Sequence, residues 1–173
     1  MQRHRGALRA TWNLLRVLIV VNVAVGVLIA ALLLASLLAE SWVMDALGVR
    51  PGEGRAALVL GMRLVAALGI AAVPLTHVVL ARLRDVVETV RQGDAFVPDN
   101  AARLRTIAWA VLGLELLHLC VGAVAAVASS PAQGLDVDWT PSPTRWLAVL
   151  LLFVLAQVFE EGSRMREDLE GVV

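Results

Sequence analysis

The chain has few of the residues on which most catalytic and metal sites depend. Its single cysteine, Cys120, stands inside an apolar run, which excludes an intramolecular disulfide and a thiolate metal cluster. His77 and His118 stand in different apolar segments without the spacing of a haem or metal site. The sequence has no phosphate-binding loop, no HExxH zinc motif and no Gly-x-Ser-x-Gly nucleophile elbow. We therefore expect neither an enzyme nor a bound cofactor.

Charge is also scarce. Charged residues make up 17% of the 173 residues, whereas soluble proteins contain about a quarter. The formal net charge at pH 7 is zero, so we expect no direct nucleic-acid binding. Lysine is absent, because all fifteen basic residues are arginine. A GC-rich genome explains this more simply than selection for phosphate or carboxylate contacts.

Four long apolar runs dominate the chain instead: Val17–Leu38, Leu64–Ala81, Ile107–Ala128 and Trp146–Phe159. A helix needs roughly 20 apolar residues to cross a bilayer, and the charged residues collect between these runs. We therefore predict an all-α protein, an integral membrane four-helix bundle. It forms a single transmembrane domain over residues 1–173, with spans at about 14–38, 57–81, 106–128 and 144–160.

The first and last runs need separate arguments. As a helix, Val17–Leu38 is about 33 Å long, which exceeds a signal-peptide core. Ala39-Glu40-Ser41 is also a poor cleavage site, so we expect a retained first span. The run Trp146–Phe159 is only about 21 Å long. It crosses the bilayer only if Arg145 extends outward and Glu160 lies at the interface.

The arginines predict the orientation. Eleven of the fifteen fall in the N-terminal segment, the loop 82–105 or the tail 161–173. Because arginine-rich short segments stay in the cytoplasm, we place both termini, this loop and this tail there. The sequence thus predicts a multi-pass protein of a cytoplasmic (inner) membrane.

Both cytoplasmic segments are expected to be helical extensions of spans two and four. Apolar stripes at helical spacing run to Gly93, which should stop the helix, and along the tail. We expect the stripes to pack together, with Gly162 allowing close approach, although two separately solvated helices would give the same pattern. Asp99 or Asn100 is expected to cap the third span, and Glu40–Arg55 to be a connector. The stripes consist of Leu83, Val86, Val87 and Val90, and of Phe159, Gly162, Met165 and Leu169.

Two blocks of sequence resemble a bacterial family of membrane proteins. One reads GDAFVPDN at residues 93–100, followed by RLRTIAW at 103–109; the other is the ending FEEGSRMREDLEGVV at 159–173. They resemble the domain-of-unknown-function family 2975, whose members are small four-span proteins. The chain departs from the family pattern at Ala95, Ala108 and Val172-Val173, where proline, glycine and threonine-valine are common. The resemblance implies no activity, but it implies small helix-turn-helix transcription regulators as partners.

The loop and the tail carry both the arginines and the resemblance, so we predict that they form a face for a soluble partner. The predicted face consists of Phe96, Asn100, Arg103, Arg105, Gly162, Arg164 and Asp168. The leading interpretation is a regulatory or sensory membrane protein.

Polar residues inside the spans suggest other functions. Glu115 and His118 stand at i,i+3 on one helix face. They form either a functional site, as a proton-responsive pair, a ligand contact or a relay, or a neutral hydrogen-bonded pair that joins helices. Asn22, His77 and Gln157 are expected to form one polar layer that joins helices. A small transporter or channel subunit, built as a homo-oligomer around Glu115 and His118, is therefore an alternative. An assembly factor for a larger membrane complex is a third. Arg63 either extends to the interface or pairs with Asp136 or Asp138.

Overall fold

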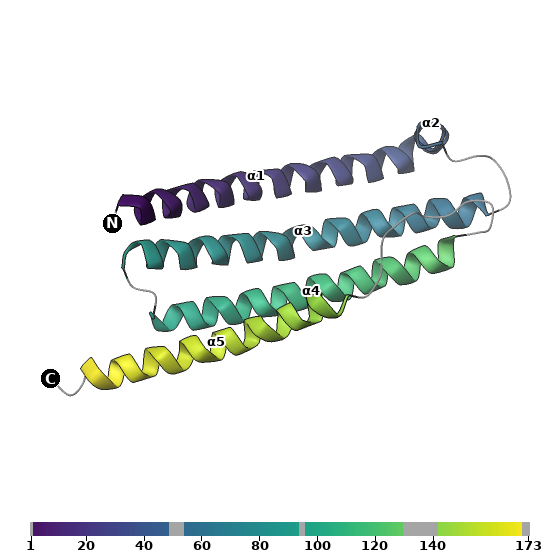
Figure 1. Cartoon of the computed structure of the whole chain (residues 1–173). Coiled ribbons are helices and arrows are strands. Elements are labelled where there is room, and N and C mark those ends of the chain that lie inside the picture. The colour runs from purple at the N-terminus through teal and green to yellow at the C-terminus, as the bar shows by residue number, and fades with distance from the viewer. Residues whose placement is uncertain (1, 49–53, 94–95, 130–141, 171–173) are drawn as a thin grey trace. The chain divides into compact units, whose positions relative to one another are not determined.

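The chain is mostly helical in the part that the structure describes. The computed structural model describes residues 2–48, 54–93, 96–129 and 142–170. These residues form α1 (Gln2–Leu38), α2 (Glu40–Ala46), α3 (Arg55–Arg91), α4 (Pro98–Ala128) and α5 (Pro143–Glu170), and they include no strand (Figure 1). The predicted all-α class is confirmed.

Four of these helices are long and apolar enough to cross a membrane. The apolar helices are Thr11–Leu38 of α1, Arg55–Arg91, Pro98–Ala128 and Pro143–Arg166 of α5. Two of them continue well beyond their apolar runs, as the sequence predicts, because α3 ends at Arg91 and α5 at Glu170. The architecture is compatible with a four-helix membrane bundle. The orientation of the termini and the single-domain boundary stay predictions.

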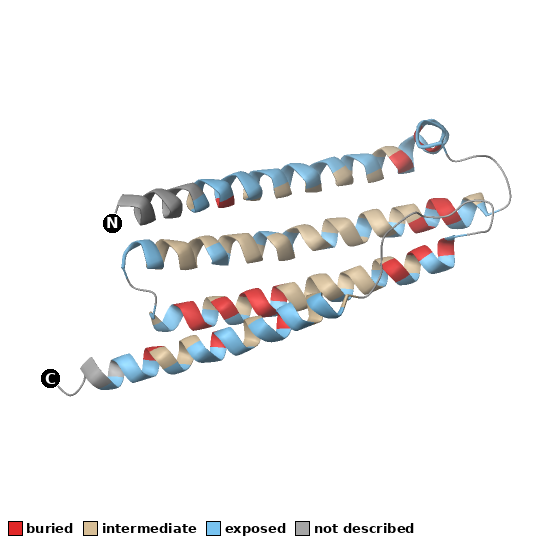
Figure 2. Cartoon of the chain, viewed as in Figure 1, coloured by how far each residue is buried: buried red, intermediate tan, exposed pale blue. Residues whose placement is uncertain are grey.

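Apolar side chains cover the outside of α1. No residue in its most apolar window is buried, and Val17, Val20 and Val27 are all exposed (Figure 2). In water, apolar surface is unfavourable by about 25 cal/mol per Å², and soluble monomers rarely expose patches of this size. Lipid tails remove this penalty, so the burial pattern of α1 fits a bilayer.

The segment after α1 is helical, where the sequence predicted only a connector. α2 begins at Glu40 after Ala39 leaves the helical conformation, and it ends before Gly48, whose φ of +74° favours glycine. Its seven residues are too few to form a stable helix alone. Tertiary packing of Val43 and Met44 therefore stabilises α2.

The helices divide into two compact units, which are described separately. Unit 2 comprises Val23–Pro74 and Leu114–Pro141. Its core joins Val43 and Met44 of α2 to Leu58 and Val59 of α3, with Ala35 and Met62 against them. Further along, α1 and α3 approach closely at Gly26. A Cβ atom there would lie 2.9 Å from Cγ2 of Val73, so any larger residue would push the helices apart.

Unit 1 comprises Met1–Asn22, Leu75–Gly113 and Ser142–Val173. Buried side chains recur along the start of α4 at helical spacing, and they define the face that packs in this unit (Figure 2). Leu104 and Ile107 of α4 meet Ala156 of α5, and Val79 of α3 packs against them. This core holds the second half of α3, the start of α4 and the middle of α5 together.

Candidate functional site

The turn between α3 and α4 positions the predicted loop residues. α3 stops as predicted, since Gly93 has a φ of +95° and its N–H donates to the Val90 carbonyl at 3.1 Å. The prediction that Asp99 or Asn100 caps α4 is wrong. Pro98 already occupies the first helical position, which suits its fixed φ and missing N–H. Asn100 therefore lies inside the first turn, where its side chain is free to bond elsewhere.

Asn100 joins α4 to α3. It is fully buried, and its Nδ2 donates to Oγ1 of Thr89 at 2.7 Å. The Thr89 hydroxyl in turn donates to the Val86 carbonyl at 2.8 Å. Nη1 of Arg103 donates to Oδ1 of Asn100 at 2.9 Å. Each polar atom of this buried amide therefore has a partner, which makes the hairpin between the helices specific.

The tail contacts the loop through aromatic rings. The ring of Phe96 stacks on that of Phe159, with centroids 5.2 Å apart. It also covers Gly162, where a Cβ would lie 2.9 Å from Cδ1 of Phe96. Gly162 does allow a close approach, but to Phe96 and not to the predicted stripe on α3. Leu83 and Val90 of that stripe are exposed.

Glu160 connects two arginines beside this contact. Its Oε2 accepts from Nη2 of Arg105 at 2.5 Å, and its Oε1 accepts from Nη2 of Arg164 at 3.0 Å. The second pair stands at i,i+4 on α5, a spacing that brings two side chains together on a helix surface. Exposed ion pairs contribute only about 0–1 kcal/mol each. Their effect here is to fix two guanidinium groups at the same place on the surface.

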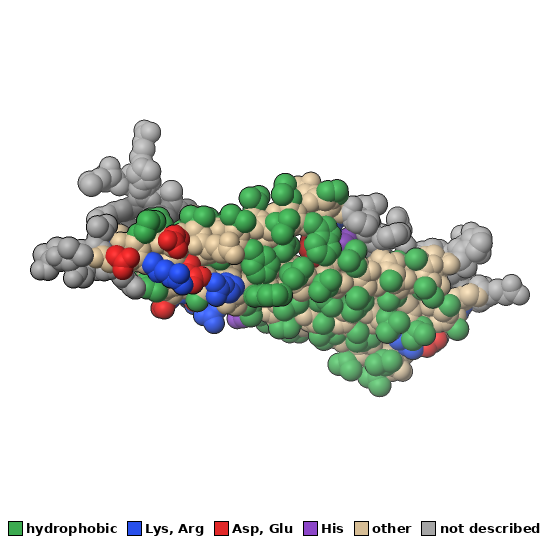
Figure 3. Space-filling view, turned by 90° about the horizontal axis from the view of Figure 1, so that it is seen from below, with side chains coloured by type: hydrophobic (Ala, Val, Ile, Leu, Met, Phe, Trp, Pro, Cys, Tyr) green, Lys and Arg blue, Asp and Glu red, His purple; other side chains and the backbone are tan. Residues whose placement is uncertain are grey.

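Loop and tail thus make one surface in unit 1, which we call the loop–tail surface. This surface has a groove between α4 and α5. Charged side chains gather over the C-terminal half of α5, whereas apolar side chains cover the first half of α5 (Figure 3). Its residues are Phe96, Pro98, Ala101, Ala102, Arg105, Glu160, Gly162, Ser163 and Arg164.

The structure brings together some residues of the predicted partner face, whereas others are not available to a partner. Phe96 meets Gly162, and Arg105 meets Arg164 through Glu160. Asn100 is buried and so cannot touch a partner. Arg103 is directed to Asn100 and, at 3.7 Å, to Asp99. Asp168 is exposed on α5.

Near the end of α3, a carboxylate is held in its charged form. Arg91 and Gln92 both donate hydrogen bonds to Oε1 of Glu88, at 2.8 and 3.1 Å. These bonds, with that from Arg91 the larger cause, keep the pKa of Glu88 below its ordinary value. The last turn of α3 therefore stays charged and solvated.

The predicted polar residues of the spans fall in different units. Glu115 and His118 belong to unit 2, and both are half-buried. Nε2 of His118 is buried without a hydrogen-bond partner among the described residues. Asn22, His77 and Gln157 belong to unit 1, where His77 and Gln157 are exposed and Asn22 is half-buried. A polar layer formed by these three stays a prediction. No group of three His, Cys, Asp or Glu side chains that could hold a metal occurs in the described part of the chain.

Arg63 has a partner that the sequence analysis missed. Its Nη2 lies 2.8 Å from Oε2 of Glu40, and its Nε donates to Oγ of Ser36 at 3.1 Å. The expected partners, Asp136 and Asp138, lie outside the described residues. The spacing of Ser36 and Glu40 is one helical turn, which could have indicated a shared partner. However, the helix is interrupted at Ala39, so helical spacing between Ser36 and Glu40 does not apply directly.

Comparison with known proteins identifies one family. Residues 42–173 match the model of a family described as a protein of unknown function, DUF2975. This match covers both resembling blocks and confirms the resemblance. No curated protein and no solved structure matches the chain.

Proposed function

Since the chain belongs to the DUF2975 family, for which no function is established, we propose from its geometry that it is a regulatory or sensory membrane protein. It acts through the loop–tail surface on a soluble partner. Both termini and this surface face the cytoplasm of a bacterium, and the protein lies in the inner membrane. It carries out no catalysis and does not contact nucleic acid itself.

One observation supports this proposal above all: segments far apart in sequence are joined into one exposed surface. Phe96 and Gly162 are in contact, and Arg105 and Glu160 form an ion pair, yet Phe96 and Arg105 are each about half exposed and Arg164 more so. Arginine and aromatic residues are enriched in protein interfaces. Internal contacts hold them in place, which reduces the entropy that binding would otherwise cost.

The partner of this surface is a soluble protein, and a small helix-turn-helix regulator is the specific candidate that the family resemblance implies. A guanidinium pair around one carboxylate carries a local excess of positive charge. It therefore favours a partner that presents carboxylates beside an apolar side chain for Phe96.

Co-purification from native membranes tests the proposal. A double variant with the charge reversals Arg105→Glu and Arg164→Glu should no longer co-purify the soluble protein that the parent recovers. Arg84→Glu is the matched control, since Arg84 pairs with Asp85 on α3 and lies outside the groove. Recovery of the same protein at parental yield by the double variant would overturn the proposal.

A second candidate function is a transporter or channel subunit in a homo-oligomer. The buried Nε2 of His118, which has no hydrogen-bond partner among the described residues, favours it, because a buried polar atom without a bond is costly unless it serves a ligand or proton. In liposomes, His118→Leu and Glu115→Gln should abolish a flux that the parent supports. If the parent supports no flux, this candidate is excluded.

A further inference from the structure

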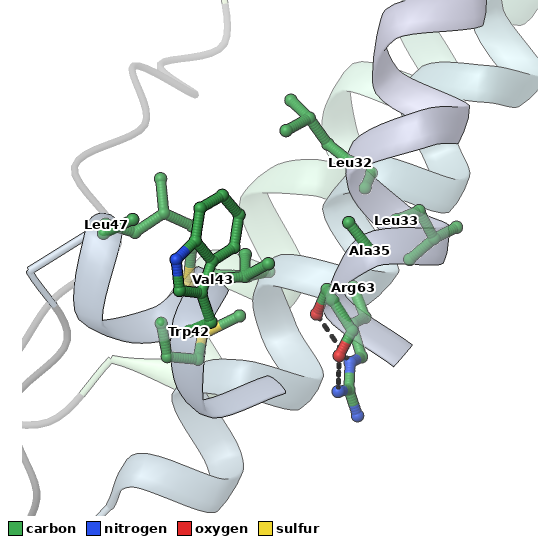
Figure 4. A pocket seen from close by; sticks show the side chains of 12 residues that line it. Leu32, Leu33, Ala35, Trp42, Val43, Leu47 and Arg63 are labelled. Atoms are coloured by element: carbon green, nitrogen blue, oxygen red, sulfur yellow. Dashed lines mark hydrogen bonds between the residues drawn. The ribbon is translucent and has the colours of Figure 1, made fainter. Parts of the chain in front are cut away.

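Unit 2 contains an apolar pocket beneath α2. Its volume is about 330 Å³, and nearly all of its wall is apolar (Figure 4). Small-molecule sites typically measure roughly 300–1,000 Å³. Each water-sized group fills about 30 Å³, so the pocket holds on the order of ten such groups. That is enough for part of one hydrocarbon chain, but too little for two whole chains.

Three helices supply the wall of the pocket. Each helix contributes apolar side chains. One side is closed by Trp42 of α2 and by Leu47 directly after it, and both are exposed at the rim (Figure 4). The apolar lining consists of Leu32, Leu33 and Ala35 from α1, Trp42, Val43, Met44 and Ala46 from α2, Leu47 directly after α2, and Met62 and Ala66 from α3. Val43 and Met44 also belong to the buried cluster with Leu58 and Val59, so this part of the pocket wall is fixed by packing.

One cation stands in this wall. Arg63 lines the pocket beside Ser36, and its side chain is 25% exposed. Nε is held by the Ser36 hydroxyl and Nη2 by the Ser36 carbonyl at 2.5 Å, so the guanidinium has a fixed direction (Figure 4). A planar, fixed guanidinium is suited to bind a carboxylate.

Glu40 shows where a carboxylate binds. Its Oε2 accepts from Nη2 of Arg63 at 2.8 Å, but its side chain is 50% exposed. It is the first residue of α2, directly after the non-helical Ala39, and no side-chain cap fixes that helix start. A half-exposed ion pair is weak, so Glu40 can turn into solvent and leave its place to another carboxylate.

We propose that this pocket binds a single-chain anionic lipid of the fatty-acid class. Its carboxylate replaces that of Glu40 on Arg63, and its hydrocarbon chain lies along Leu32, Met62 and Ala66. The exposed indole of Trp42 marks the rim as a membrane interface, which is where a fatty acid in a bilayer holds its carboxylate. The site lies in unit 2 and does not depend on the proposed partner binding, so either proposal can fail without the other.

The test uses the full chain in nanodiscs of zwitterionic phospholipid. Stearic acid with a nitroxide on its chain is added at low mole fraction, and tryptophan fluorescence is measured. We expect quenching that saturates, and that is largely lost in Trp42→Phe. Unlabelled stearic acid should compete, whereas stearyl alcohol, which has the same chain and no charge, should compete poorly. Quenching that only rises in proportion to added lipid, or equal competition by the alcohol, would overturn the proposal.

Variants of the ion pair sharpen the test. Arg63→Gln should weaken fatty-acid binding by about tenfold or more, and Arg55→Gln, on the same helix but outside the pocket, should leave it unchanged. Glu40→Gln should strengthen binding, because it removes the competing carboxylate, and a misfolded protein could not show such a gain. Ala66→Phe should fill the pocket and abolish saturable binding. Unchanged or weaker binding by Glu40→Gln contradicts the displacement of Glu40.

Discussion

The side chain of Asn100, at the start of α4, donates a hydrogen bond of 2.7 Å to the hydroxyl of Thr89, near the end of α3. The amide is completely shielded from solvent. A polar group in such a position is costly if it loses its partner. This bond therefore determines how the hairpin closes, and with it the position of Phe96 and Arg105.

Removal of the Thr89 hydroxyl should loosen the hairpin. Thr89→Val removes the hydroxyl that accepts the hydrogen bond from the buried Nδ2 of Asn100, so the free energy of unfolding should fall by about 1–3 kcal/mol. Thr106→Val is the control, because the Thr106 hydroxyl donates within its own helix, to the Ala102 carbonyl at 2.9 Å. Unfolding in mixed micelles measures both variants. Equal losses in the two would show that Thr89 has no role between helices.

A side chain at position 162 should displace Phe96. Gly162→Leu places carbon atoms where the Phe96 ring lies, so the variant should be less stable and its tail more accessible to protease. In a Phe96→Ala background the same substitution should lower the stability much less, because the space of the Phe96 ring is then vacant. Thermal unfolding of the four proteins in this cycle gives the coupling between the two sites. Additive effects would contradict the contact.

Labelling from one side of the membrane tests the proposed orientation. In a Cys120→Ser background, cysteines replace Ser41 of α2 or Arg164 of α5, both of which are exposed. A membrane-impermeant maleimide added to intact cells should label position 41 only. In inverted vesicles it should label position 164 only. Labelling of both positions from the same side would mean an even number of crossings between them, which contradicts the three crossings of the proposed topology.

Local patterns predicted what depends on local sequence. The apolar runs predicted the four long helices, since length and hydropathy suffice for that. Gly93 predicted the end of α3, because few other residues adopt its positive φ without strain. Pro98 decided where α4 begins, and the more familiar capping residues Asp99 and Asn100 led to a wrong helix start.

Contacts between distant segments could not be predicted in this way. α2 has too short a pattern to be recognised, and it depends on the packing of Met44 against α3. The mate of Gly162 is a loop residue, Phe96, whose position follows from the hairpin and not from helical periodicity. The pocket at Arg63 requires three helices to meet, which no single window of sequence contains.

The most direct test of the central claim is site-specific photocrosslinking in native membranes. A photoreactive amino acid replaces Arg164 on the loop–tail surface or Leu151 on the exposed apolar part of the same helix. We predict that position 164 crosslinks one soluble protein, that this product disappears when Arg105→Glu is added, and that position 151 gives only lipid adducts. If position 164 also gives only lipid adducts, or only a crosslink to a second copy of the chain, the loop–tail surface does not bind a soluble partner.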